Sequence, residues 1–211
     1  MTTISRVATS FSIRRASPND ISLLVQIHLQ SFPSFFLTFL GYSFLAELYA
    51  SILIDPSGIA LVAEGDKNIV GFVAGTSQPA GFYSRLLRRR WWRFAVASVS
   101  PILRKPTAIP RLLRAFSMPK QVTKLEGRGT LMSIAILPEV QGEGIGKALV
   151  AAFLNESVHH GLSYVDLETD RDENEATNQF YLRLGFTRER TYVTFEGRGM
   201  NQYVIRVVPE Q

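Results

Sequence analysis

The chain has 211 residues, of which 46% are hydrophobic, and a formal net charge of +5. This length and composition are typical of one ordinary α/β domain with a substantial core. The sequence contains no cysteine, which excludes disulfides, a thiolate nucleophile and cysteine-bound metals. No two of the three histidines have the helical spacing of metal ligands, so no metal site is expected.

Nothing in the sequence resembles a targeting or membrane-spanning segment. Residues 1–12 lack the apolar run of a secretory signal, and no stretch has 18 uninterrupted apolar residues. There is also no internal repeat. We therefore expect a cytoplasmic protein that forms a single domain over residues 1–211.

The first elements of the chain are predicted to be a strand and a helix. Residues 11–14 alternate between apolar and polar side chains, as a half-buried strand does. Ser17, Pro18 and Asp20 then form a helix start, with Ser17 as the N-cap and Asp20 beside the positive end of the helix dipole. This helix is expected to end near Pro33.

A second helix and a β-hairpin are predicted next. Residues 42–54 place apolar side chains on one helical face. Residues 58–63 and 69–74 are two apolar runs separated by the polar turn at 65–68. Their spacing and composition predict a pair of antiparallel strands.

A strongly basic segment follows the hairpin. Residues 79–128 contain twelve Lys and Arg but one acid, Glu126, and so carry a net charge of +11 in a chain whose total is +5. The segment also holds many large apolar side chains. Pro101, Pro106 and Pro110 are predicted to divide it into two or three short helices.

The most informative segment begins with an apolar run that ends at Pro138. Three alternate glycines, Gly142, Gly144 and Gly146, follow, and a long amphipathic helix then begins. The first N–H groups of a helix have no partner within it, and the helix dipole adds positive charge there. The segment therefore predicts a site for an anion, most often a phosphate.

Three phosphate-binding patterns compete for these glycines. A Walker loop needs one more residue before its Gly-Lys pair, and Ala148 stands where that loop has a magnesium-binding hydroxyl. A dinucleotide-binding fingerprint needs a different glycine spacing, although Asp166 lies about 20 residues further on, as that pattern requires. The third pattern, Gln-x-x-Gly-x-Gly, is met by Gln141, Gly144 and Gly146.

A second motif supports the third pattern. A strand-like run at 163–169 is followed by Asn174, by Tyr181 seven residues later, and by Gly185 and Phe186 at the predicted end of a helix. In this order and spacing, the two motifs resemble the GNAT family of N-acetyltransferases. The resemblance is specific over about residues 128–187 and looser over residues 11–76.

The resemblance implies an α/β fold of α+β-like character: a single GNAT-type domain with a mixed, mostly antiparallel sheet flanked by helices. Residues 192–195 and 202–208 are expected to be its closing strands. The basic, Trp-containing segment at 79–127 is expected to be a helical insertion within the domain.

The resemblance also implies a function, the transfer of an acetyl group from acetyl-coenzyme A to a primary amine. Direct attack in a ternary complex is expected, because no cysteine is available to form an acyl-enzyme. The acceptor stays open between a protein amine, an amino sugar and another small amine. The alternative is a non-catalytic module that binds coenzyme A or a membrane surface and has kept only the fold.

By the same resemblance, coenzyme A is held by a splayed strand, the glycine loop, the first helical turn and a later helix, and no metal is needed. The implied cofactor-binding residues are Ile134, Ala135, Ile136, Gln141, Gly142, Glu143, Gly144, Ile145, Gly146, Lys147, Asn174 and Tyr181.

Two residues are candidates for catalysis. The resemblance places Tyr181 at the thioester, where its hydroxyl would protonate the departing thiolate; a phenol and a thiol are close enough in pKa for this transfer. Tyr181 is alternatively an aromatic that only packs. Glu168 is the candidate general base, with a simple rim carboxylate as the equal alternative, and Glu126 is a poorer candidate. Water relays remain open.

Three other features have structural interpretations that compete with functional ones. His28 lies in the region that forms the acceptor wall of GNAT folds, although a lone helical histidine is more often structural. His159 and His160 are best explained as cations at the end of a helix. The acidic run at 170–173 is most simply a solvated loop before a helix.

The basic segment has three interpretations. It is a passive insertion, or an amphipathic element over residues 85–116 that lies on an anionic membrane with Trp91 and Trp92 at the interface, or a lid that attracts an anionic acceptor. Nucleic acid binding is not expected, because no recognised motif accompanies the charge. The oligomeric state is not predicted.

Overall fold

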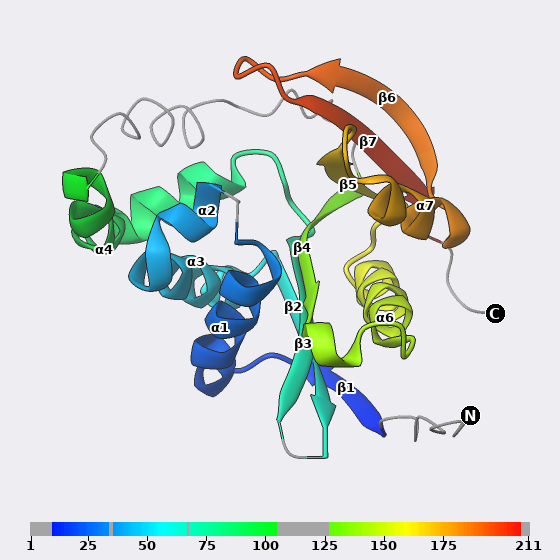
Figure 1. The fold of residues 1–211 in the computed structure, drawn as a ribbon, viewed down its shortest axis with the longest axis horizontal. Helices are drawn as coiled ribbons and strands as arrows, with labels where there is room; N and C mark the ends of the chain where they lie inside the picture. Colours follow the sequence, from blue (N-terminus) through cyan, green and yellow to red (C-terminus); the bar gives the residue numbers. More distant parts are fainter. Residues whose placement is uncertain (1–9, 34–35, 67, 105–126, 208–211) are drawn as a thin grey trace, which may run out of the picture.

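The computed structural model describes residues 10–33, 36–66, 68–104 and 127–207 (Figure 1). Within them the chain forms a seven-stranded sheet with the strand order β1-β2-β3-β4-β5-β7-β6. The strands are β1 (Phe11–Arg15), β2 (Gly58–Gly65), β3 (Ile69–Thr76), β4 (Arg128–Ile136), β5 (Tyr164–Asp170), β6 (Thr187–Val193) and β7 (Gly199–Arg206). The helices are η1 (Pro18–Asp20), α1 (Ile21–Ser31), α2 (Phe36–Phe39), α3 (Gly41–Ile54), α4 (Phe82–Arg104), η3 (Pro138–Val140), α6 (Ile145–His159) and α7 (Glu175–Arg183).

Every neighbouring pair of strands is antiparallel except β4 and β5, which are parallel. This parallel pair is short. It joins residues 128–130 of β4 to residues 164–166 of β5, after which the two strands diverge. The mixed, mostly antiparallel sheet predicted from the sequence is confirmed.

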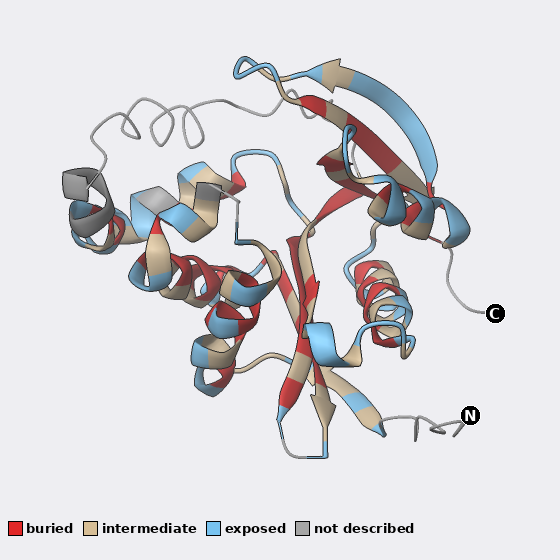
Figure 2. Cartoon of the chain, viewed as in Figure 1, coloured by how far each residue is buried: buried red, intermediate tan, exposed pale blue. Residues whose placement is uncertain are grey.

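Helices cover both faces of the sheet (Figures 1 and 2). On one face α1, α3 and α4 pack through a core that includes Phe44, Tyr49 and Phe72. On the other face α6 and α7 pack through a second core that includes Leu149 and Phe153. The sheet is therefore the middle of three layers, and helices pack against both of its faces.

The predicted helix start at Ser17 is confirmed. The carboxylate of Asp20 accepts hydrogen bonds from the Ser17 backbone N–H at 2.7 Å and from the Arg14 guanidinium at 2.8 Å. These bonds lower the pKa of Asp20 to about 2, so the group is charged at neutral pH. They fix the end of β1 to the start of α1.

The predicted division of the basic segment is wrong at Pro101. α4 runs through that position, and its break lies instead at Arg90, where φ is −137° and ψ is 25°. Contacts with the core decide the course of the helix, because Phe82, Leu86 and Phe94 are all buried. Pro106 and Pro110 lie outside the described residues.

Arginines of α4 also form ion pairs with Glu47 of α3 and with Asp55, the residue that follows α3. The sequence did not indicate these pairs. The pairs are Arg85–Asp55 at 3.6 Å, Arg89–Asp55 at 3.9 Å, Arg90–Glu47 at 2.8 Å and Arg93–Glu47 at 3.7 Å. Four arginines of α4 thus share two acids, so only part of the positive charge of this helix is balanced locally.

Candidate active site

The site begins where β4 leaves β5. From Leu131 onward β4 pairs with β3 on one edge, while its other edge has no partner strand in the described chain. The Leu137 N–H donates to the Val70 carbonyl on β3 at 2.9 Å. Because backbone groups of an antiparallel strand alternate between its edges, those of Ile134 and Ile136 face the open edge. The backbone groups of Ala135 face β3.

The glycine loop lies between the end of β4 and the start of α6. Gly142 and Gly144 have φ values of 87° and 85°, and a Cβ at either position would meet nothing within 4 Å. Glycine is needed at both positions for its backbone conformation. The open space beside them leaves room for a ligand to approach the main chain.

The start of α6 supplies unpaired donors beside this space. The first helical hydrogen bond runs from the Ala148 N–H to the Gly144 carbonyl, so the preceding N–H groups have no acceptor within the helix. Ile145 is buried in the core and orients this turn, while Lys147 is exposed on it. This geometry fits a pyrophosphate held by backbone N–H groups and the helix dipole.

The remaining loop residues fix its position. The Gln141 side chain donates to the Ile136 carbonyl at 3.3 Å, which ties the loop to the end of β4. A Cβ on Gly146 would lie 3.2 Å from Ile136 and 3.4 Å from Phe180, so α6 packs closely there. Glu143 is partly buried and carries a negative side chain, so its backbone is the part suited to a phosphate.

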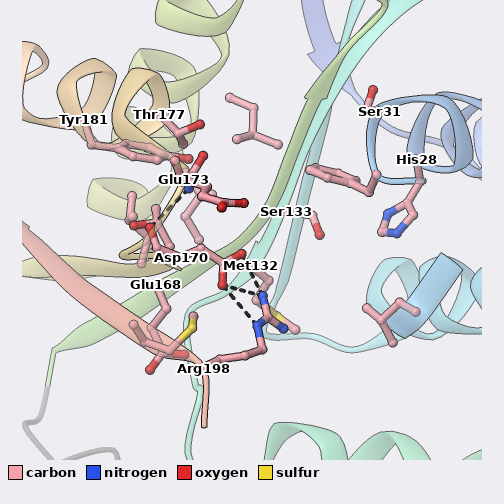
Figure 3. Close-up of a pocket in the computed structure, with 18 of the residues that line it drawn as sticks. His28, Ser31, Met132, Ser133, Glu168, Asp170, Glu173, Thr177, Tyr181 and Arg198 are labelled. Atoms are coloured by element: carbon pink, nitrogen blue, oxygen red, sulfur yellow. Dashed lines mark hydrogen bonds and ion pairs between the residues drawn. The ribbon is translucent and has the colours of Figure 1, made fainter. Parts of the chain in front are cut away.

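A cavity of about 720 Å³ opens between the diverging strands (Figure 3). In Figure 3, His28 and Ser31 lie on one side of it and Thr177 and Tyr181 on the other. It is lined by His28, Ser31, Phe32 and Leu37; by residues 131–134 of β4; by residues 167–170 and 172–174; and by Thr177, Tyr181, Arg198 and Met200.

Tyr181 lies on the wall of the cavity formed by α7. Its residue exposure is 4%, and its ring is wedged edge-on between Phe180 and Phe186, with ring centroids 5.1 and 5.5 Å away. Burial raises the pKa of Tyr181 well above its usual value. The phenol is therefore protonated throughout the neutral range, as a proton donor must be.

A buried polar cluster that the sequence did not reveal holds α7 in place. The Asn178 carbonyl oxygen accepts hydrogen bonds from Thr169 at 2.6 Å and from the Tyr203 hydroxyl at 3.1 Å. The Asn178 amide group and the Asn174 amide group both donate to the Asp170 carbonyl, at 3.1 and 3.4 Å. Asn174 thus lines the cavity and is held to the end of β5, while Asn178 anchors α7 one helical turn before Tyr181.

The acidic run at 170–173 is not simply a solvated loop. Glu168, Asp170, Asp172 and Glu173 all line the cavity. Arg198, on the turn between β6 and β7, binds both oxygens of Asp170 at 2.6 and 2.7 Å. No local pattern in the chain predicts this pair, because the register of β5 against β7 brings the two residues together. Glu126, the poorer candidate base, lies outside the described residues.

His28 lies on the opposite wall. It is 2% exposed, and its Nδ1 is 2.7 Å from the Tyr49 hydroxyl. Burial lowers the pKa of His28 to about 4, so the ring is neutral at physiological pH. At the far end of α6, His160 lies 3.6 Å from Glu156 and Gly161 has a φ of 72°, as the predicted helix end requires.

Neither a metal-binding cluster nor a membrane-spanning helix occurs in the part of the chain that the structure describes. Those residues contain no group of three or more His, Cys, Asp or Glu side chains placed to hold a metal ion. None of their helices is both long enough and apolar enough to cross a membrane.

Comparison with solved structures identifies the fold. A putative GNAT acetyltransferase from Desulfovibrio desulfuricans has a TM-score of 0.64 at 20% identity, with 94% of this chain and all of that chain covered. The yncA protein of Salmonella typhimurium, a putative acetyltransferase solved with its cofactor acetyl-CoA, has a TM-score of 0.63 at 13% identity, with 96% and 97% covered. The fold is thus that of GNAT acetyltransferases.

Sequence comparison agrees. Residues 107–186 match the model of the acetyltransferase (GNAT) family. N-alpha-acetyltransferase 30 of Schizosaccharomyces pombe is 36% identical over 76 residues, which are 36% of this chain and 50% of that protein. Over residues 107–186 the chain therefore carries the sequence features of the GNAT acetyltransferase family. It spans half or less of the length of the curated relatives it matches.

The loop assignment is tested by replacing Gly144 with glutamate. The new side chain places bulk and negative charge where a pyrophosphate would lie. Saturation with acetyl-coenzyme A at a hundred times Kd should raise the wild-type Tm by about 5 to 10 °C, and Gly144→Glu should lose most of this rise. Calorimetry or dye-based melting measures both.

Gly161→Glu is the matched control, because Gly161 also has a positive φ and open space where a Cβ would lie, but it stands at the other end of α6. It should keep the ligand-induced rise. An undiminished rise in Gly144→Glu would mean that the loop does not bind the cofactor.

Proposed function

We propose that this chain is an N-acetyltransferase that moves the acetyl group of acetyl-coenzyme A to a primary amine by direct attack in a ternary complex. One observation carries the proposal: residues of β4 beyond its pairing with β5 line the same cavity as Tyr181, and the open glycine loop at the start of α6 follows the end of β4. The match of residues 107–186 to the GNAT family model and the GNAT-like fold support it.

In this proposal the glycine loop with the start of α6, and the open edge of β4, hold the cofactor. The N–H groups at 142–147 receive the pyrophosphate, and the backbone groups of Ile134 and Ile136 pair with the amide-bearing arm as a further strand would. A backbone N–H of β4 also stabilises the negative charge that develops on the thioester oxygen.

The reaction needs two proton movements. The amine nitrogen must lose a proton before it attacks the thioester carbon. As the carbon–sulfur bond breaks, the Tyr181 hydroxyl donates its proton to the leaving sulfur. We propose Glu168 as the acceptor of the amine proton, directly or through water, because it lines the cavity one strand away from β4.

The alternative is a GNAT fold that binds coenzyme A without turnover. Such a module would show the ligand-induced rise in Tm and release no free coenzyme A with any amine. The protonated, buried Tyr181 beside the open strand favours the enzyme.

Tyr181→Phe tests the acid. The change keeps the ring packing and removes the proton, so it should lower kcat roughly ten- to a thousandfold and leave the Kd for acetyl-coenzyme A within about twofold. Steady-state release of coenzyme A and calorimetric binding measure the two quantities. Because the pKa of Tyr181 is raised, the wild-type rate should not fall through loss of this proton below about pH 10.

Tyr203→Phe is the control, because it removes another buried hydroxyl next to α7 that lies outside the cavity lining. If kcat for Tyr181→Phe is no lower than kcat for Tyr203→Phe, Tyr181 is not the general acid and only packs against its neighbours.

We also propose that α4 forms a peripheral contact with an anionic membrane. Its outer face is apolar at helical spacing, with Trp92, Val96 and Val99 exposed by 54%, 68% and 53%, and Trp91 beside them is 66% exposed. Arg88 is exposed next to this face. Interfacial tryptophans with basic neighbours favour an anionic lipid surface.

The two tryptophans test this contact. Replacing both Trp91 and Trp92 with serine should reduce sedimentation with phosphatidylserine-containing vesicles at least tenfold, since burial of each indole supplies roughly 1.5–3 kcal/mol. Tyr42→Ser, an exposed aromatic on α3, is the control and should not change it. If the wild type does not bind the vesicles at low salt, α4 does not contact the membrane and is a passive insertion.

A further inference from the structure

The cavity carries negative charge in a protein that is positive overall. Its lining has four acids and one arginine, and the chain as a whole has a charge of +5. The guanidinium of Arg198 is engaged by Asp170 at 2.6 Å, and Asp172 is engaged by Arg171 at 2.8 Å. A ligand with its own carboxylate or phosphate near the amine would meet this wall unfavourably.

Glu173 differs from the other acids of this wall in its backbone. Its φ is 54°, the left-handed region that non-glycine residues rarely occupy. Strain of this kind persists where the surrounding structure holds it, often at a binding site. Glu173 forms no ion pair within the described chain, and its place on the α7 side of the cavity is shown in Figure 3.

The opposite wall offers a neutral hydrogen-bonding atom. His28 Nε2 is buried and has no hydrogen-bond partner among the described residues, while Nδ1 is held by Tyr49. Phe32 packs edge-on against the ring, with centroids 4.9 Å apart, so the orientation of the ring is fixed. A buried polar atom without a partner is costly, and a ligand group that bonds to it recovers that cost.

Apolar side chains complete the cavity between these walls. Phe32, Leu37, Met132 and Met200 line it. A purely polar acceptor would leave this surface without contacts, and long methionine side chains adapt to ligands of varied shape.

From the acidic wall, the unpartnered His28 Nε2 and the apolar lining we infer the class of acceptor, an inference that rests on the proposed function. The acceptor is a peptide-like amine: a primary amine with a neutral amide beside it and an apolar side chain, and with no negative charge nearby. Glu173 attracts the ammonium group, and His28 Nε2 bonds to the amide. The acidic wall also argues against the interpretation of the basic segment as a lid for an anionic acceptor.

Three matched acceptors, compared across the wild type and variants of His28, test the inference. Leucinamide has the amide, 3-methylbutylamine lacks it, and leucine replaces it with a carboxylate. For each we compare kcat/KM, from coenzyme A release, in the wild type, His28→Leu and His28→Gln. The amide also lowers the basicity of the amine, so the readout is the change in the ratio of two acceptors between proteins.

The ratio of leucinamide to 3-methylbutylamine should fall at least tenfold in His28→Leu, mainly through KM for leucinamide, since the loss of a bond to a buried polar group is worth about that factor. His28→Gln, which keeps a polar atom near the Nε2 position, should recover part of the ratio. His160→Leu, outside the cavity, should leave it unchanged.

Charge is tested separately. In the wild type leucine should be the poorest of the three acceptors, and Glu173→Gln should raise the ratio of leucine to leucinamide about fivefold, the effect of roughly 1 kcal/mol.

Two results would overturn the inference. One is a leucinamide ratio within twofold of wild type in His28→Leu. The other is turnover with none of the three acceptors in a protein that acetyl-coenzyme A still stabilises. If acetyl-coenzyme A does not stabilise the protein at all, the proposed function itself fails.

Discussion

The structure depends on the short pairing of β4 with β5. Only residues 128–130 and 164–166 form the parallel ladder, and beyond them one edge of β4 has no partner strand in the described residues. Backbone N–H and C=O groups away from water need partners, so such an edge is costly unless a ligand completes it. The cavity, the position of α7 across from β4 and the approach to α6 all follow from this divergence.

A buried ionic cluster marks the point where the strands part. Arg128 and Asp166 are both nearly inaccessible, and the Arg128 guanidinium binds both oxygens of Glu189 at 2.8 and 2.9 Å. Asp166 in turn accepts from Thr130 at 2.6 Å and from Gln202 at 3.2 Å. Removing one member of such a cluster leaves an uncompensated buried charge. The cluster therefore links β4, β5, β6 and β7 at the base of the cavity.

The parts of the site that could be predicted from the sequence are those fixed by backbone chemistry. The glycines at 142 and 144 are needed for their left-handed backbone conformations, whether or not a ligand binds there. The spacing from Asn174 to Tyr181 is local to one helix. Residues whose role depends on strand register could not be predicted. Arg198 reaches Asp170 because β5 and β7 pair with Asp170 opposite Met200. β6 begins at Thr187, earlier than expected, because its polar residues give no alternating pattern.

Hydrogen exchange of the backbone amides tests the origin of the cofactor site most directly. When acetyl-coenzyme A binds, exchange should slow in two separate segments, the open edge of β4 at 132–136 and the loop and first turn of α6 at 142–147, because both would then donate to the cofactor. Exchange in β1, which lies at the far edge of the sheet, should change little. Saturating binding that leaves the exchange of both segments unchanged would contradict the central claim that the divergence of β4 and β5 creates the cofactor site.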